Sequence, residues 1–387
     1  MYIKYVFGRD WPSKSAGTSF TVFSSYGIAK ANRKNSVEIL MKKNTTSKEY
    51  DKILRDYFNL IKLKNYNIKF IENKFLLIDK TTSFYIKAFQ YLKNEAKNKR
   101  LDVIITRKVG FLPYAYYLKK KYNVTVIFEA HDYYLDTDKK RKKYMKKKLF
   151  QNWFLPKIDG ILTHLKTMEQ LYKSVIPEQN YLLARTGINK VYKYENKKEN
   201  IIAYIGSLDR RKKISDIFEA LQYIKEIDIK LIIIGGKNKK EIEYYSNKAK
   251  DMGIYKKIEI TGWVKRKKID EILQNVKLGI VPLEENFFNK RLTSPMKVFN
   301  YFSHGIPVIG TKFPTLEEII NDKRGMLYEA NNSKDLAQKI IYLINNEDEY
   351  LKIQKNIYNF NKELFWDYRG KKILSFIRNV KSSQENI

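Results

Sequence analysis

"NIIAYIGSLDRRKKISDIFEALQYIKEIDIKLIIIGG", residues 200–236, has the pattern of a strand, a helix and a second strand. The first apolar run ends in a glycine turn, and the last run ends in two glycines. Between them, residues 213–226 place isoleucine, phenylalanine and leucine on one helical face. A strand, a helix of this length and another strand form a right-handed βαβ unit, so this stretch predicts a parallel sheet.

The same alternation runs through the rest of the chain. In the second half, helices are expected at 239–253, 267–276 and 333–346, and strands at 257–264, 277–283 and 306–311. In the less regular first half, strands are expected at 1–8, 75–79, 101–107 and 124–132, and helices from about residue 18 and at 109–122. Each half therefore predicts an α/β fold with a doubly wound parallel sheet, in which ligands bind beyond the carboxyl ends of the strands.

A polar, charged segment separates the two halves. It reads "KYENKKEN", residues 193–200, and the composition changes on both sides of it. We expect an N-terminal domain over 1–192, this segment as the linker, and a C-terminal domain over 201–365. Residues 366–387 are expected to form a C-terminal helix that crosses back to the N-terminal domain. A chain of 387 residues is long enough for two domains of ordinary size.

The composition narrows the class of protein. Cysteine is absent, which excludes disulfides and thiolate metal sites and suits a reducing compartment. The first residues, "MYIKYVFGRDWP", do not have the pattern of a signal peptide. No apolar run approaches the roughly 18 residues that a membrane-spanning helix needs. We therefore expect a cytoplasmic protein that is soluble or peripheral to a membrane.

Positive charge is concentrated in the first half. The net charge is +34, and residues 1–200 hold 42 Lys and Arg against 18 Asp and Glu. Residues 139–148, "KKRKKYMKKK", carry eight of these cations close to the apolar side chains of Tyr144, Met145, Leu149 and Phe150. Such a block is compatible with a solvated helix face, a nucleic-acid patch or an anionic membrane surface. The apolar neighbours favour the inner face of a membrane, so no nucleic-acid partner is expected.

A second stretch, "RLTSPMKVFNYFSHGIPVIG" at 291–310, predicts a short helix with a bare N-terminus. Ser294 can cap this helix, Pro295 suits its first position, and apolar side chains recur at helical spacing from Met296 onward. Lys297 stands in the first turn. A helix N-terminus and a lysine both attract anions, so we expect an anionic ligand here.

Taken in order, five segments of the second half resemble the donor-binding half of family 4 glycosyltransferases. They are "YIGSLDRRKKISDIFEAL", "LIIIGG", "ITGWVKRKKIDEIL", "GIVPL" and "TSPMKVFNYFSHGIPVIGT". In the first half, "PSKSAGTSF", "FEAHD" and "TGIN" resemble the family's glycine loop, its histidine loop and the turn before the linker. The resemblance implies the GT-B fold, in which two Rossmann-like doubly wound domains face each other across a cleft.

The resemblance also implies a reaction. The family transfers a sugar, typically a hexose, from a UDP- or GDP-sugar to a glycan or lipid-linked acceptor with retention at the anomeric carbon, here in cell-surface polysaccharide or glycoconjugate synthesis. A departing diphosphate needs its growing charge stabilised. The chain has no DxD pattern at a strand end apart from Asp136–Asp138, which lies beside a lysine run. Neither a metal nor another cofactor is therefore expected, and cations and a helix N-terminus take that role.

Several residues acquire roles by this resemblance. Lys297 and Lys213 would contact the diphosphate, and a neutral His131 would hydrogen-bond to a hydroxyl of the transferred sugar. The other expected donor contacts are Gly17, Thr18, Gly206, Ser207, Arg210, Arg211, Trp263, Val264, Ser294, Pro295, Met296, Asn300 and Glu318. Retention is then expected from front-face attack, with a leaving phosphate oxygen taking the acceptor's proton. His164 and His304 are expected to be structural residues in helices.

The chain departs from the family pattern at two places. Where the family has paired glutamates, this chain has Leu292 and Asn300. An asparagine amide can still bind ribose hydroxyls, whereas a leucine cannot. Where the family often has an arginine, this chain has Ser207, and Arg210 or Arg211 would substitute. The donor sugar is therefore less well defined than the reaction.

Two other classes of protein remain open from the sequence, and a third is disfavoured. A nucleotide-sugar 2-epimerase with the same GT-B architecture would need acid–base carboxylates and more histidines near the sugar. A basic nucleic-acid-binding protein without catalysis would need interleaved charges and aromatic side chains on one face, with the phosphate motifs accidental. A nicotinamide-dependent dehydrogenase would need a GxGxxG after a strand, which this chain lacks.

Overall fold

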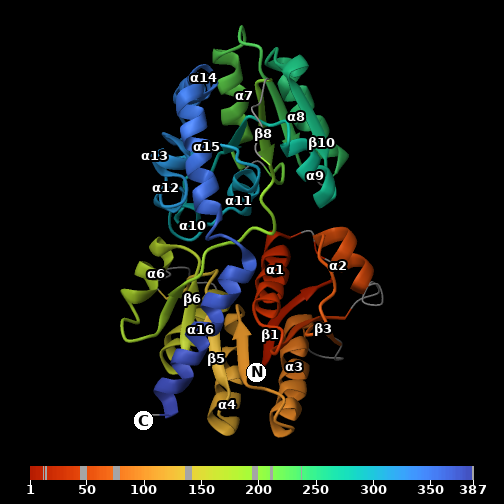
Figure 1. Ribbon diagram of the computed structural model, residues 1–387, viewed down its shortest axis with the longest axis vertical. Coiled ribbons are helices and arrows are strands. Elements are labelled where there is room, and N and C mark those ends of the chain that lie inside the picture. The colour runs from red at the N-terminus through yellow and green to blue at the C-terminus, as the bar shows by residue number, and fades with distance from the viewer. Residues whose placement is uncertain are drawn as a thin grey trace. The chain divides into compact units, whose positions relative to one another are not determined.

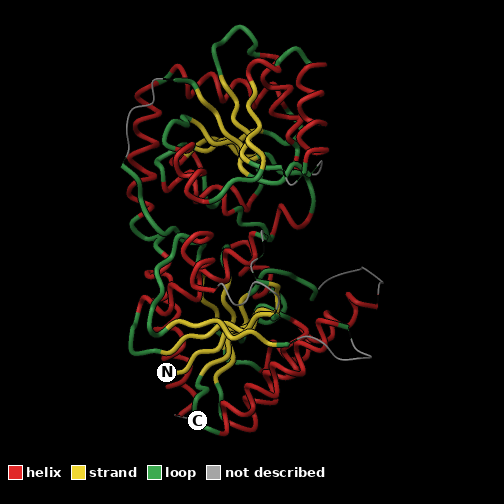
Figure 2. Tube along the Cα trace, turned by 90° about the vertical axis from the view of Figure 1, so that its right-hand side faces the viewer, coloured by secondary structure: helices red, strands yellow, loops and turns green. Residues whose placement is uncertain are grey.

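The structure is a computed structural model that describes residues 1–11, 13, 15–43, 50–72, 79–135, 142–193, 199–209, 212–236 and 238–385. It divides into two compact units, and each is described by itself. Unit 1 comprises Met1–Gly187 and Phe365–Ile387, and unit 2 comprises Ile188–Leu364. Each unit is built on one twisted sheet with helices packed around it (Figures 1 and 2). The predicted pair of α/β domains with doubly wound parallel sheets is confirmed.

Unit 1 contains a seven-stranded sheet in the order β3-β2-β1-β4-β5-β6-β7. Its strands, which all pair in parallel, are β1 (Tyr2–Asp10), β2 (Ser36–Lys42), β3 (Tyr66–Ile71), β4 (Val103–Thr106), β5 (Thr125–Glu129), β6 (Gly160–Thr163) and β7 (Tyr181–Leu183). The strand order reverses between β1 and β4. Such a reversal opens a crevice at the carboxyl ends of the two strands, where ligands bind in folds of this kind.

The helices of unit 1 include one from the far end of the chain. They are α1 (Ala16–Ala31), α2 (Tyr50–Phe58), α3 (Lys80–Lys97), α4 (Leu112–Tyr122), α5 (Lys142–Phe154), α6 (Lys166–Lys173) and α16 (Trp366–Glu385). Helix α16 packs against α1 (Figure 1). The two backbones touch, because a Cβ on Gly370 would lie 2.4 Å from the carbonyl oxygen of Gly27. Only glycine fits such an approach, so the two glycines let α16 pack closely on α1.

Unit 2 contains a six-stranded parallel sheet in the order β10-β9-β8-β11-β12-β13. Its strands are β8 (Ile201–Ile205), β9 (Lys230–Ile234), β10 (Ile258–Gly262), β11 (Leu278–Val281), β12 (Val308–Thr311) and β13 (Gly325–Tyr328). Its helices are α7 (Ile214–Tyr223), α8 (Lys239–Asp251), α9 (Arg266–Leu273), α10 (Phe287–Arg291), α11 (Met296–Ser303), α12 (Pro314–Glu317), α13 (Asn321–Arg324), α14 (Ser333–Asn345) and α15 (Glu347–Asn361). Here the order reverses between β8 and β11, which places a second crevice at their carboxyl ends.

The boundary between the units lies earlier than the sequence predicts. The expected N-terminal domain ends at 192, but the residues from Ile188 onward pack on unit 2. The Ile188 N–H donates to the Leu364 carbonyl at 2.7 Å, and the Tyr192 N–H donates to the Ser303 carbonyl at 2.8 Å. These hydrogen bonds fix the segment before the expected linker. That linker, at 193–200, lies largely outside the described residues.

Candidate functional site

The turn after β8 is the centre of the expected donor site in unit 2. Gly206 ends the strand at φ +154°, a backbone conformation that favours glycine. A Cβ there would lie 3.2 Å from Lys297 Nζ. Ser207 follows, and its carbonyl accepts a hydrogen bond from the Tyr204 hydroxyl at 2.9 Å. The structure thus brings Gly206, Ser207 and Lys297 together at the carboxyl end of β8, where the strand order reverses.

Lys297 is half-buried and lies against an aromatic ring. Its Nζ is 4.0 Å from the centroid of the Tyr204 ring. Burial, aided by the positive charge of Lys212, lowers the pKa of Lys297 to about 7. Among the residues that the structure describes, no carboxylate pairs with this ammonium. A half-buried cation with no ion-pair partner gains most from an anionic ligand, which is the setting expected of a phosphate contact.

The start of α11 differs from the prediction by one residue. The sequence places Ser294 as the cap and Pro295 at the first helical position, but the helix begins at Met296. Pro295 is itself the N-cap, because its ψ of 115° is extended, and its side chain makes no capping hydrogen bond. Ser294 therefore lies outside the cap position. Leu292, which replaces a family glutamate, is buried with 4% of its surface exposed and packs in the protein interior.

Lys213 occupies an unusual backbone position at the start of α7. It is the N-cap of the helix and adopts a left-handed conformation, with φ 52° and ψ 34°. A non-glycine residue in this conformation costs about 1 kcal/mol or more and often marks a functional turn. The neighbouring Arg210 and Arg211, expected to contact the diphosphate, lie outside the described residues.

Four of the expected donor contacts in unit 2 lie on three different segments. Trp263 is 40% exposed and Val264 is half-buried in the loop after β10, so the tryptophan is not a core residue. Asn300 on α11 accepts a hydrogen bond from Arg266 Nη1 at its Oδ1, at 2.7 Å. Its amide NH₂ remains the group that can donate to a ligand. Glu318, half-buried, is the C-cap of α12.

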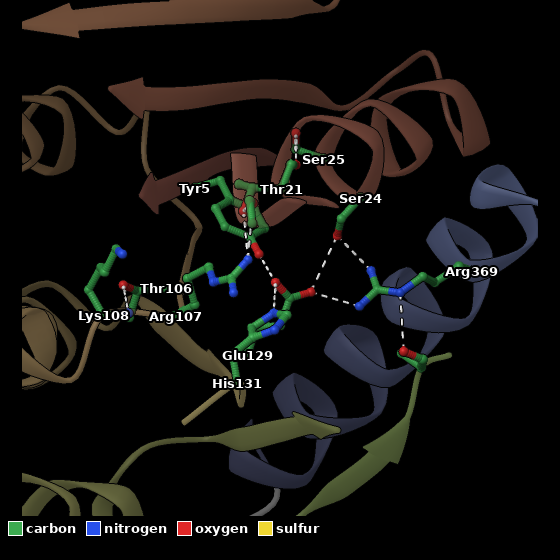
Figure 3. Close-up of polar contacts among 12 residues, drawn as sticks. Tyr5, Thr21, Ser24, Ser25, Thr106, Arg107, Lys108, Glu129, His131 and Arg369 are labelled. Atoms are coloured by element: carbon green, nitrogen blue, oxygen red, sulfur yellow. Dashed lines mark hydrogen bonds and ion pairs between the residues drawn. The ribbon is translucent and has the colours of Figure 1, made fainter. Parts of the chain in front are cut away.

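In unit 1, His131 belongs to a buried polar network around Glu129 (Figure 3). Glu129 accepts hydrogen bonds from Arg369 Nη2 at 2.7 Å, from Ser24 Oγ at 3.3 Å and from the Tyr5 hydroxyl. His131 Nε2 lies 3.3 Å from Glu129 Oε2. Burial raises the pKa of Glu129, and the Arg369 guanidinium opposes that rise. The network joins β1, α1, β5 and α16, and sequence reading did not predict it.

His131 is held as a neutral imidazole. Its ring contacts Phe20 edge-on, with centroids 4.7 Å apart, and stacks on His164 at 5.0 Å. Burial and then the positive charge of Arg107 lower the pKa of His131 well below its usual value. The prediction that His164 lies in a helix is wrong, because this residue follows β6 and precedes α6. The turn after β6 places His164 beside His131.

The neutral state of His131 predicts a pH effect on stability. The unfolded chain binds a proton at this residue below its ordinary pKa of about 6.5, whereas the native state does not, so native stability falls as the pH falls. Between about pH 7.5 and 5.5 the wild type should lose about 1 kcal/mol more than His131→Gln. Urea unfolding midpoints of both proteins at the two pH values measure the difference. Glu129 is present in both proteins, so it does not account for a difference between them. An equal change of stability with pH in wild type and His131→Gln would contradict a neutral His131 in the native state.

Gly17 and Thr18 lie in the first turn of α1, after the N-cap Ser15. The Thr18 N–H donates to the Ser15 carbonyl at 3.0 Å and to Ser15 Oγ at 3.3 Å. The Thr18 amide is therefore engaged in capping the helix, and the expected donor contacts of Gly17 and Thr18 stay predictions. The Gly17 carbonyl accepts a hydrogen bond from Arg107 Nη1 at 3.2 Å.

Two cations that directly follow β4 were not among the predicted site residues. Arg107 and Lys108 lie at the reversal of strand order, beside α1. Burial lowers the pKa of Arg107 to about 9 and that of Lys108 to about 7. The signal available in the sequence was the pair of basic residues that ends the strand "LDVIITRK". Basic side chains directly after a buried strand lie where ligands bind in this class of fold.

Comparison of sequences finds similarity to glycosyltransferases, most clearly in the second half of the chain. Residues 189–360 match the family model described as glycosyl transferases group 1. This segment contains Lys213, Trp263 and Lys297. An uncharacterized glycosyltransferase of Methanocaldococcus jannaschii is 27% identical over 297 residues, which cover 74% of this chain and 77% of that protein.

Comparison of structures agrees on the fold. A sucrose-phosphate synthase from Thermosynechococcus elongatus superposes with a TM-score of 0.76 at 15% identity and covers 98% of this chain and 99% of its own. The Anabaena protein HepE, solved in complex with UDP and glucose, has a TM-score of 0.72 at 11% identity, with both chains covered completely. These likenesses confirm the predicted architecture of two Rossmann-like domains of the GT-B type.

Proposed function

We propose that this chain, whose residues 189–360 match the model of the group 1 glycosyl transferases, moves a sugar from a UDP- or GDP-sugar to a glycan or lipid-linked acceptor with retention at the anomeric carbon. The HepE structure contains UDP and glucose, which supports a nucleotide-sugar donor. A role in cell-surface polysaccharide or glycoconjugate synthesis is part of the same proposal. Unit 2 would bind the donor and unit 1 the acceptor.

The setting of Lys297 carries this proposal. The ammonium lies at the carboxyl end of β8, over the Tyr204 ring and beside the Gly206 turn. As the glycosidic bond breaks, negative charge grows on the diphosphate, and a cation in a water-poor site stabilises that charge more than one in water. A pKa of about 7 means that a bound diphosphate would draw a proton onto Lys297. The positive end of α11 would add to the effect.

The remaining steps follow from the groups in unit 1. A neutral imidazole can hydrogen-bond to a sugar hydroxyl without carrying charge toward the reacting carbon, which suits His131. We propose that the acceptor attacks the same face from which the diphosphate departs. A phosphate oxygen of the leaving group would take the proton of the acceptor hydroxyl, and retention would result.

Nucleotide binding tests the proposal. UDP or GDP should bind the full chain in calorimetry, and Lys297→Gln should weaken that binding at least about tenfold, since a charge-assisted contact contributes about 1.5–3 kcal/mol. Lys256→Gln is the matched control, because this lysine is exposed in the same unit. EDTA should leave binding and turnover nearly unchanged. Absence of nucleotide binding, or strict dependence on a divalent metal, would contradict the proposal.

A face of α5 supports attachment to a membrane surface. Met145, Leu149 and Trp153 are spaced four residues apart and are 53%, 65% and 63% exposed. Tyr144 and Phe150, expected as further apolar anchors, are instead half-buried. Part of the basic block at 139–148 lies outside the described residues. None of the described helices is long and apolar enough to cross a membrane.

Vesicle binding tests this part of the proposal. The chain should sediment with anionic vesicles and not with neutral ones, and salt should release it, because each Lys or Arg near the surface contributes at most about 1 kcal/mol. Neutralising Lys146 and Lys148 together with Trp153→Ala should cut binding sharply. Exposed Lys240, in unit 2, provides the control variant. Equal binding to both vesicle types, or a preference for nucleic acid at physiological salt, would contradict membrane attachment.

A further inference from the structure

Unit 1 gathers three cations where its strand order reverses. Arg9 lies near the end of β1, and Arg107 and Lys108 directly follow the neighbouring strand β4. Arg107 points toward Thr21 on α1, with Lys108 beside it (Figure 3). Phe7 lies under both: Arg107 Cζ is 5.4 Å and Lys108 Nζ is 4.8 Å from its ring centroid. The cations therefore stand at the crevice that this class of fold uses for ligands.

Neither Arg107 nor Lys108 has an ion-pair partner among the residues that the structure describes. The hydrogen bonds of Arg107 go to neutral oxygens, the Gly17 carbonyl and Thr21 Oγ1, both at 3.2 Å. Asp132, the acid whose field favours the charged form of both, is exposed and beyond ion-pair distance. Burial makes charging costly for both groups, as their lowered pKa values indicate.

Lys4, on the neighbouring strand β1, is more fully buried than the half-buried Lys108 and shows the contrast. Lys4 Nζ lies 3.0 Å from Glu38 Oε2 and 3.1 Å from Glu95 Oε2. The fold thus supplies carboxylates to a buried cation where the role is structural, because an unpaired buried charge is strongly unfavourable. Arg107 and Lys108 lack such partners in the described part of the chain. A negatively charged ligand would supply the counter-charge for these two cations.

We propose that Arg107 and Lys108 bind a phosphate group on the acceptor. The planar fork of an arginine matches two oxygens of a phosphate, and a lysine adds a point charge that suits a doubly charged group. The proposal rests on the proposed function, in which unit 1 takes the acceptor. In the proposed function, other cations would bind the donor diphosphate: Lys213 and Lys297, which lie inside the segment that matches the glycosyl transferase family. Arg107 and Lys108 lie outside that segment.

Competitive acetylation of the full chain at about pH 8, read by mass spectrometry, tests the proposal. Only a neutral amine reacts, and a pKa of about 7 leaves roughly nine-tenths of Lys108 neutral at that pH. A bound phosphate that raises this pKa to about 9 would leave roughly one-tenth neutral and slow labelling about tenfold. Glycerol 3-phosphate and pyrophosphate should protect Lys108 and leave exposed Lys120 unchanged. Arg107→Gln should abolish the protection.

The same measurement distinguishes the acceptor from the donor as the source of the phosphate. Protection by glycerol 3-phosphate that persists in Lys297→Gln supports an acceptor phosphate. Protection by UDP alone, lost in Lys297→Gln, would assign the anion to the donor and overturn the proposal, as would no protection by any probe. The glycerol 3-phosphate and UDP measurements on the wild type and on Lys297→Gln decide between acceptor and donor even if Arg107→Gln does not fold. If UDP binds in calorimetry but no phosphate protects Lys108, this inference alone fails. If a phosphate probe protects Lys108 but UDP does not bind in calorimetry, the phosphate site is supported and the proposed function fails.

Discussion

Lys297→Ala is expected to lower the rate of sugar transfer by roughly a hundredfold or more, because one transition-state charge contact contributes about 3 kcal/mol. The ammonium lies where the Gly206 turn, the Tyr204 ring and the start of α11 meet. Its stabilisation of the diphosphate grows as the leaving group gains charge. The effect should therefore fall mainly on kcat rather than on the KM for the nucleotide sugar. Steady-state kinetics with saturating acceptor measure both constants.

The fold should survive this substitution. Lys297 has no carboxylate partner among the described residues, so its removal leaves no buried acid behind. Thermal unfolding of Lys297→Ala should match that of the wild type, and exposed Lys256→Ala serves as the kinetic control. Near-normal turnover in Lys297→Ala, or an equal loss in Lys256→Ala, would remove Lys297 from the reaction.

Arg369→Gln is expected to destabilise unit 1 by about 3–5 kcal/mol, because it leaves a buried carboxylate without its cation. The side chains of Arg369 and Glu129 are 4% and 2% exposed. The guanidinium also donates to Ser24 Oγ at 2.6 Å and to the Ala184 carbonyl at 3.2 Å. It thus ties α16 to α1, to β5 and to the chain after β7. Calorimetric unfolding of the full chain should show an earlier transition for this variant.

Two variants sharpen this test. Arg378→Gln, on an exposed position of the same helix, should unfold like the wild type. Glu129→Gln combined with Arg369→Gln should recover part of the loss, since it removes the unpaired charge that makes the single variant costly. An Arg369→Gln protein as stable as Arg378→Gln would show that the ion pair contributes little.

The sequence predicted the strands whose apolar runs are uninterrupted. Strands β8, β9 and β11 each coincide with such a run. Helices cover both faces of a parallel sheet, so the side chains on both sides of its strands are apolar. Strands β2 and β3 were not predicted. Glu38 interrupts the apolar pattern of β2, and in the structure this buried acid forms an ion pair with Lys4 on β1. The expected strand at 75–79 lies largely outside the described residues, and Asp79 caps α3.

Residues of the candidate site could be predicted from the sequence where a motif lies at the end of a predicted strand or at the start of a predicted helix. Lys297 follows a Thr-Ser-Pro step at the start of a helix, and the structure places it beside Gly206. The Glu129–Arg369 pair was beyond sequence reading, because its members are 240 residues apart and no local pattern connects them. The charge state of Lys108 could not be predicted from the sequence either. It depends on the burial of the ammonium and on the lack of a paired carboxylate among the described residues.

Proton NMR of the full chain incubated with a panel of UDP- and GDP-sugars tests most directly whether the protein is a retaining glycosyltransferase. At least one donor should release its nucleoside diphosphate, and the first sugar product should have the anomeric configuration of the donor. Lys297→Ala should slow this release by roughly a hundredfold. An inverted first product, or no consumption of any donor under conditions where the chain is folded, would contradict the assignment of a retaining glycosyltransferase.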